Sequence, residues 1–82
     1  MTVERHLFEQ GKRYRVKRSF MSGASVFIAD ELVTFISDGY SHYDNCFVYV
    51  FQSQTDGQEK IWWLHENESA TSWQAFFEPL AA

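Results

Sequence analysis

Two short apolar runs that flank one turn constrain the fold of this chain most. Residues 47–51 are apolar at five consecutive positions, and residues 61–64 are apolar at four. Between them the pair Asp56-Gly57 predicts a hairpin, because the favoured tight turn needs positive φ at its central positions. A sheet face open to water would alternate with polar residues, so both faces of this hairpin must be covered. We expect the interior to cover one face, and the C-terminal helix or a second protein chain to cover the other.

The rest of the pattern predicts further strands. Apolar and cationic residues alternate over 12–20, with Tyr14 and Val16 on the apolar side, which is typical of a half-buried strand. Residues 21–25 predict a loop, and residues 32–36 predict a second strand after a polar turn. Residues 39–45 predict an irregular loop. The chain is therefore expected to be mainly β.

A helix is predicted only near the C-terminal end. Thr71 and Gln74 have the spacing of a capping box, in which each side chain bonds a backbone amide at the start of a helix. Trp73, Phe76 and Phe77 then lie on one stripe that covers the core. We expect one domain over 1–82, divided into an N-terminal arm (1–10), a β-barrel (12–64) and a C-terminal helix (71–78).

The size of the chain demands a dense core. A chain of 82 residues buries only about 60 to 65% of the surface that its unfolded form exposes. Eight Phe, four Tyr and three Trp supply the density, since each large ring buries roughly 150 to 250 Å².

Charge is divided unevenly along the sequence. Residues 1–18 hold six cations against two carboxylates, for +4, and residues 19–82 hold Lys60 against nine carboxylates, for −8. We expect the basic first strand to pair with acidic neighbours, the alternative being a local site for an anionic ligand. The net charge of −4 opposes nucleic-acid binding, which needs a basic face.

No apolar run reaches the roughly 18 to 20 residues of a membrane span, and the first residues lack the apolar stretch of a signal peptide. The expectation is a cytoplasmic protein without membrane contact. The single cysteine, Cys46, agrees with a reducing compartment and is expected to be a half-buried thiol.

The order of predicted elements resembles that of the SH3-like small barrels, and individual residues resemble an uncharacterised family of short bacterial proteins. The resemblance rests on residues 11–16, Phe20, Glu31-Leu32, Phe35, Tyr40, Tyr43-Asp44, Trp63, Trp73 and Phe76-Phe77. It implies an SH3-like barrel of about five antiparallel strands with a short C-terminal helix, and it implies no known reaction.

Departures from peptide-binding SH3 domains are informative. Those domains carry an Ala-Leu-Tyr-Asp type of motif where this chain reads "RVKRSF", and their terminal tyrosine segment corresponds to "FFEPL" here. Binding of proline-rich peptides is therefore not carried over to this protein.

Residue patterns for catalysis are weak. His42 and Cys46 are four residues apart, about 13 Å on an extended strand, which is too far for a nucleophile and its base. The histidines and the cysteine show none of the close pairs of zinc sites, and no glycine-rich phosphate loop occurs. We predict no enzyme, no catalytic residue, no cofactor and no metal. A small enzyme or ligand-binding barrel would need a pocket of at least about 300 Å³.

Recognition remains as the predicted function. We predict a protein-interaction module whose partner is another protein, a second copy of the chain included. The alternative is an acidic inhibitor or immunity-type protein that blocks a basic surface of another macromolecule. The candidate contact surface consists of Tyr40, His42, Tyr43, Asp44, Trp62 and Trp63.

Overall fold

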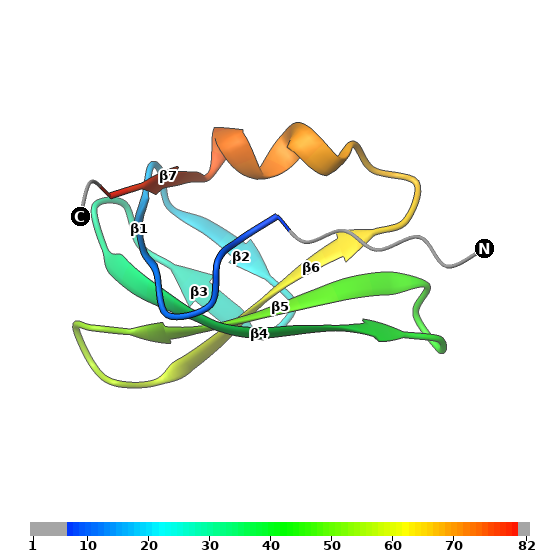
Figure 1. Ribbon diagram of the computed structural model, residues 1–82, viewed down its shortest axis with the longest axis horizontal. Helices are drawn as coiled ribbons and strands as arrows, with labels where there is room; N and C mark the ends of the chain where they lie inside the picture. Colours follow the sequence, from blue (N-terminus) through cyan, green and yellow to red (C-terminus); the bar gives the residue numbers. More distant parts are fainter. Residues whose placement is uncertain (1–6, 81–82) are drawn as a thin grey trace.

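The computed structural model describes residues 7–80, and the domain they form is mainly β (Figure 1). Five strands make one antiparallel sheet in the order β6-β5-β4-β1-β7, while β2 and β3 form a separate hairpin. In chain order the elements are β1 (Arg13–Val16), β2 (Phe20–Ser22), β3 (Ser25–Phe27), β4 (Leu32–Ser41), β5 (Cys46–Ser53), β6 (Glu59–His65), the 3₁₀ helix η1 (Ala70–Ala75) and β7 (Phe77–Pro79).

The hairpin predicted from the two apolar runs is confirmed. β5 and β6 pair antiparallel from Cys46↔His65 to Gln52↔Glu59, and both are longer than predicted. The connection is longer than a two-residue turn, because residues 54–58 separate the strands, and within it only Gly57 has positive φ, at 72°. The Asp56 carboxylate instead accepts the Gln58 amide at 2.9 Å, which closes the turn from its side chain.

The prediction of one strand over 12–20 is wrong. β1 ends at Val16 and β2 begins at Phe20, and the predicted loop 21–25 lies within the β2–β3 hairpin. Gly23 has a φ of +57° at the first central position of the two-residue connection, a conformation that glycine adopts without strain.

β4 is also longer than predicted, so residues 39–41 are strand and not loop. They pair with residues 46–48 of β5, after a register shift between Phe35 and Ser37. The sequence pattern did not indicate this part of β4, because residues 37–41 are mostly polar. A strand that extends beyond the core exposes both faces to solvent, so its apolar and polar residues no longer alternate.

The C-terminal helix differs from its prediction over 71–78. Ser69, not Thr71, caps η1, and its hydroxyl accepts the Thr71 amide at 3.2 Å. Residues 77–79 form β7 and pair with β1, which gives their backbone groups the partners that a helix would have supplied.

The predicted N-terminal arm contains a core residue. Residues 1–6 lie outside the described part of the chain, but Phe8 is only 6% exposed. Its ring contacts Tyr14 and Phe51 of the sheet and Trp73 of η1, with centroids 5.0 to 5.3 Å away. The segment before β1 therefore lies between the sheet and η1.

The C-terminal residues cover the core side of the sheet, not the opposite face that we predicted for them. Trp73 contacts Phe8, and Phe76 contacts Trp62 at 6.2 Å. The opposite face of β5 and β6 carries Val48, Val50 and Ile61, all half-buried.

The β2–β3 hairpin covers one edge of the sheet through two side chains. Edge strands expose unpaired amides, and here Ile61 donates to the Ser25 hydroxyl at 3.0 Å and Trp63 to the Ser22 hydroxyl at 2.8 Å. Gly23 makes this approach possible, because a Cβ there would lie 2.9 Å from the Trp63 indole nitrogen. Within residues 7–80, no helix has the length and apolar character needed to cross a membrane.

Candidate functional site

The turn between β4 and β5 and the residues that brace it form the candidate site, which we call the β4–β5 tip. Ser41 and Cys46 are the last paired residues, and residues 42–45 connect them. Asn45 takes the left-handed conformation, with φ of 52°, which asparagine tolerates better than most residues. The Ser41 hydroxyl donates to Asp44 at 3.0 Å. The turn is thus held by its own polar side chains.

Tyr40 connects the tip to the loop that follows β6. Its hydroxyl donates to Glu66 at 2.7 Å, and the Glu66 amide donates to the Asn45 carbonyl at 3.0 Å. The Glu66 hydrogen bond, with smaller effects of burial and of the Glu66 charge, raises the pKa of the Tyr40 phenol. The Tyr40 ring also contacts His42 and Phe47, with centroids 5.0 and 5.1 Å away. Two chain segments therefore fix the position of Tyr40.

Tyr43 and His42 face solvent at the end of this braced turn. Tyr43 is 101% exposed, whereas Tyr40 is 37% exposed. A fully exposed tyrosine on a rigid turn offers a large contact area at a small loss of rotamer entropy, which is why tyrosine is common in binding loops. Of the predicted contact surface, Tyr40 lies at the end of β4, and His42, Tyr43 and Asp44 lie in the turn that follows.

Carboxylates surround the same turn. Burial raises the pKa of the Cys46 thiol most, and the negative charges of Asp44, Glu68 and Glu66 raise it further. The thiol donates to the Asp44 carbonyl oxygen at 3.2 Å. These effects favour the neutral thiol of Cys46 over its thiolate. The tip carries acidic and aromatic groups side by side.

The two tryptophans of the predicted surface lie elsewhere. Trp62 is 5% exposed and contacts Tyr49 and Phe77 in the core, so its assignment to the contact surface is wrong. Adjacent residues of a strand face opposite sides, so Trp63 faces away from the core. It is half-buried under Gly23 of the β2–β3 turn.

Sequence reasoning missed the bracing residues. Glu66 and Glu68 follow β6 and reach the tip only because β6 returns antiparallel beside β5, with His65 opposite Cys46. The acidic residues after the predicted strand 61–64 could have indicated this contact. In an antiparallel hairpin, the end of strand 61–64 lies beside the start of strand 47–51, and therefore beside the turn that precedes residue 47.

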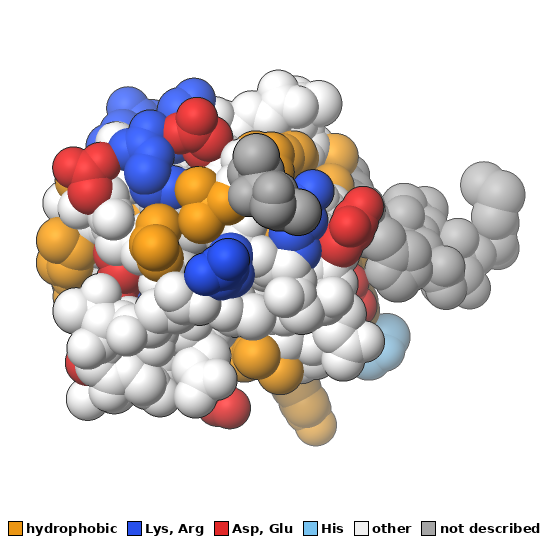
Figure 2. Space-filling model, turned by 60° about the vertical axis from the view of Figure 1, so that its left-hand side comes forward, with side chains coloured by type: hydrophobic (Ala, Val, Ile, Leu, Met, Phe, Trp, Pro, Cys, Tyr) orange, Lys and Arg blue, Asp and Glu red, His pale blue; other side chains and the backbone are white. Residues whose placement is uncertain are grey.

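The basic first strand pairs with acidic neighbours, as predicted. Arg15 contacts Asp30 at 2.5 Å and forms a second ion pair with Glu78 of β7. Lys17 donates to the Gln74 carbonyl at 3.0 Å, and the Arg18 guanidinium lies 4.9 Å from the Phe76 ring centre. Figure 2 shows one group of Lys and Arg side chains at the upper left with acidic side chains beside it, and further Lys and Arg side chains apart from that group.

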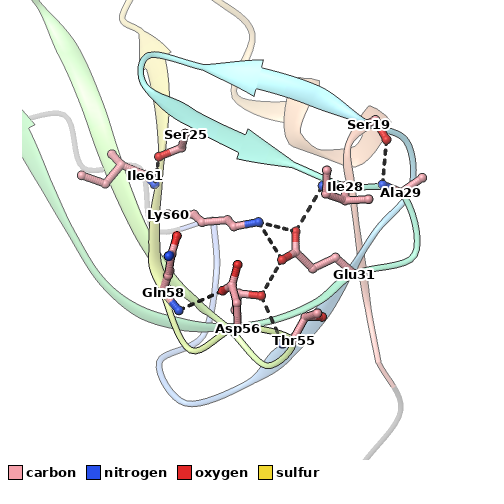
Figure 3. Close-up of polar contacts among 11 residues, drawn as sticks. Ser19, Ser25, Ile28, Ala29, Glu31, Thr55, Asp56, Gln58, Lys60 and Ile61 are labelled. Carbon is pink, nitrogen blue, oxygen red and sulfur yellow. Dashed lines mark hydrogen bonds and ion pairs between the residues drawn. The ribbon is translucent and has the colours of Figure 1, made fainter.

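A buried ion pair lies at the other end of the sheet (Figure 3). The Lys60 ammonium donates to both oxygens of Glu31, at 2.8 and 2.6 Å, and the Ser53 hydroxyl donates to the same carboxylate. Burial alone would raise the pKa of Glu31, but the hydrogen bonds from Lys60, Ser53 and the Ile28 amide outweigh it and lower that pKa. The pair joins the β3–β4 turn to β6.

Metal-ligating side chains do not converge in the described part of the chain. Within residues 7–80, no three His, Cys, Asp or Glu side chains are placed to share an ion. His65 accepts the Asn67 amide on its Nδ1 at 3.2 Å, and its own amide donates to Glu68 at 2.9 Å. The hydrogen bonds of His65 therefore hold the loop after β6, the loop that braces the tip.

Comparisons with known proteins bear on the fold. No protein-family model and no curated protein matches this chain. A solved structure of an integron cassette protein from the mobile metagenome of Vibrio cholerae is similar, with a TM-score of 0.71 and 20% sequence identity. The match covers 94% of this chain and 90% of that one. Nearly the whole chain therefore shares its fold with a small bacterial protein.

Proposed function

We propose that this protein is an SH3-like small barrel that serves as a non-catalytic protein-interaction module and contacts its partner through the β4–β5 tip. The strand order β6-β5-β4-β1-β7, with a 3₁₀ helix before the last strand, supports the SH3-like assignment. The raised pKa of the Cys46 thiol supports a role without nucleophilic chemistry, because the thiolate is the reactive form.

The exposure of Tyr43 carries this proposal. Small proteins need their aromatic residues for the core, yet this ring is fully in water while the turn beneath it is braced by Glu66 and Asp44. Binding residues concentrate on loops held by a rigid scaffold, and a preformed contact surface loses less entropy on binding. These observations favour Tyr43 as the central contact residue of the proposed surface.

Affinity capture with a matched variant tests the proposal. The full chain and its Tyr43→Ala variant are immobilised and exposed to a lysate of the source organism, and the retained proteins are identified by mass spectrometry. We expect a partner that wild type retains and Tyr43→Ala loses. Met21→Ser is the control, because Met21 is 73% exposed on β2, outside the tip.

Light scattering extends the test to self-association. A homodimer that Tyr43→Ala converts to a monomer would identify the second copy as the partner. A monomeric wild type that retains the same proteins as Tyr43→Ala would refute the tip as the contact surface.

The acidic residues of the tip favour a second candidate, an inhibitor that blocks a basic surface of another macromolecule. Asp44, Glu66 and Glu68 act together on the Cys46 thiol, so their negative charges converge at the tip beside the exposed aromatic rings. Electrostatic association weakens as salt screens the charges. Capture that falls steeply between low and high salt favours this candidate, and capture insensitive to salt contradicts it.

A further inference from the structure

A groove lies at the opposite end of the sheet from the β4–β5 tip. It consists of two adjoining hollows of about 330 and 280 Å³, both lined by Ile28, Asp56 and Lys60. One wall is β3 with the turn that follows it, and the other is the β5–β6 hairpin. Figure 3 shows Lys60 and Glu31 pointing toward each other between these walls.

One wall of the groove is apolar and exposed. Val26 and Ile28 both line the larger hollow, and they are 44% and 51% exposed. Side chains two residues apart on an extended segment project to the same side, so Val26 and Ile28 together offer an apolar contact to a ligand in the groove.

The opposite wall is acidic. Four carboxylates line the two hollows (Asp30, Glu31, Asp56 and Glu59) against the single ammonium of Lys60, which leaves a net charge of −3. Lys60 is fully engaged by Glu31, and Arg15 offsets Asp30 from outside the groove. Within residues 7–80, neither Asp56 nor Glu59 forms an ion pair. A cation in the groove would therefore meet two carboxylates whose negative charges no cationic side chain of the described residues neutralises.

The edge of β6 adds a backbone donor. Ile61 and Trp63 direct their amides outward to serine hydroxyls of the β2–β3 hairpin. Outward amides recur at every second residue of an edge strand, so the amide of Glu59 faces the same way, beyond the last serine. A peptide carbonyl in the groove can accept from it.

From these observations we propose that the groove between β3 and the β5–β6 hairpin binds a short extended peptide in which apolar and cationic residues alternate. Successive side chains of an extended peptide point to opposite sides. The apolar residues would contact Val26 and Ile28, and a lysine or arginine would meet Asp56 and Glu59. The acidic wall repels phosphate-bearing ligands. This inference goes beyond the proposed function, because it concerns a second surface at the other end of the sheet.

Fluorescence anisotropy with synthetic peptides tests the groove. The probe is a fluorescein-labelled hexapeptide that alternates leucine and lysine, and the comparison peptides replace leucine by serine or lysine by glutamate. We expect saturable binding of the leucine-lysine peptide to the full chain. We expect Ile28→Ser and Glu59→Lys each to weaken it about tenfold. Amide NMR shifts on titration should cluster at Val26, Ile28 and Glu59.

Two control variants match the test variants. Tyr43→Ser removes a more exposed aromatic side chain at the β4–β5 tip, outside both hollows, and Asp44→Lys reverses a charge at the same tip. Both should leave the affinity within about twofold, because exposed charges at a distance are screened. Unchanged thermal unfolding of all variants confirms that the fold is intact.

Four outcomes would overturn the inference. They are a lack of saturation by the leucine-lysine peptide, equal affinity for the serine-lysine peptide, equal affinity of all four variants, and amide shifts confined to the tip. A concentration-dependent dimer that Glu59→Lys dissociates would also refute it, because the occupant would then be a second copy. Since Tyr43 lies outside the groove, loss of the tip function leaves this result unchanged.

Discussion

Replacing Phe8 by alanine tests whether the segment before β1 is an integral part of the core. The Phe8 ring contacts seven other aromatic rings at centroid distances of 5.0 to 6.1 Å. Most of these contacts are edge-to-face, the arrangement that aromatic pairs prefer. Removing the ring would leave a cavity between the sheet and η1 that rigid strands cannot close.

The expected loss of stability is large for so small a protein. Truncation of a buried phenylalanine to alanine costs about 3 to 5 kcal/mol. The whole free energy of unfolding of an 82-residue domain is roughly 4 to 12 kcal/mol, from about 0.05 to 0.15 kcal/mol per residue. Each kcal/mol shifts the midpoint of thermal unfolding by about 4 to 8 °C, so Phe8→Ala should lower that midpoint by about 12 to 40 °C.

Urea unfolding followed by tryptophan fluorescence measures this loss. Tyr43→Ala is the matched control, because it removes an aromatic ring that is fully exposed, and surface substitutions of this kind change stability by only about 0.5 kcal/mol. A loss below about 1 kcal/mol in Phe8→Ala would refute the central role of this ring, since it would fall below the range for buried phenylalanines.

Three further predictions concern single residues. Glu31→Gln should lower stability by about 3 kcal/mol at pH 7, because it leaves a buried ammonium without its partner. The folded-state pKa of Glu31 is lowered, so its contribution is present above the unfolded pKa of about 4.3 and is lost as the pH falls through the folded value. Urea unfolding should show the gap between wild type and variant narrowing in acid, and a constant gap contradicts this. Gly23→Ala should cost about 1 to 3 kcal/mol in thermal unfolding, because its Cβ would lie 2.9 Å from the Trp63 indole at positive φ. Gly39→Ala, with open space around the added Cβ, is the control, and equal losses would refute the steric reason. Cys46 should react with iodoacetamide more slowly than glutathione does at pH 8, because burial and nearby carboxylates raise its pKa. An equal or faster rate would contradict the protonated thiol.

The local pattern of apolar and polar residues was sufficient to predict much of the sheet. The apolar runs 47–51 and 61–64 lie within β5 and β6, and Tyr14 and Val16 of the alternating segment are buried as expected. These signals are strong because the period-two alternation and the turn residues report directly on backbone geometry.

Tertiary contacts determined what the sequence pattern did not reveal. Leu7 and Phe8 are two apolar residues between polar stretches and show no strand or helix periodicity, so their local sequence does not indicate that Phe8 fills the space beneath η1. The same holds for Glu31 and Lys60, which are 29 residues apart and are buried only because they meet. Trp62 and Trp63 are adjacent in the sequence, so their side chains project to opposite faces of the sheet. Which of the two faces the core depends on the strand register.

The candidate surface was predictable where it is local in sequence. Tyr40, His42, Tyr43 and Asp44 lie within five positions, so their shared turn follows from chain connectivity alone. Glu66 reaches the same turn through the pairing of β5 with β6, which requires knowledge of where β6 ends.

The distribution of exposed apolar side chains connects the two proposed surfaces. Within residues 7–80, the large hydrophobic side chains that are exposed are Met21, Val26, Ile28, Tyr40 and Tyr43. Two of them are at the β4–β5 tip, and the other three lie on β2, β3 and the turn after β3. Tyr40 and Tyr43 belong to the tip, Val26 and Ile28 line the groove, and Met21 lines neither hollow. The two proposed surfaces therefore share no residue. Substitutions at one end should therefore leave binding at the other end unchanged, because contacts that share no partner contribute independently.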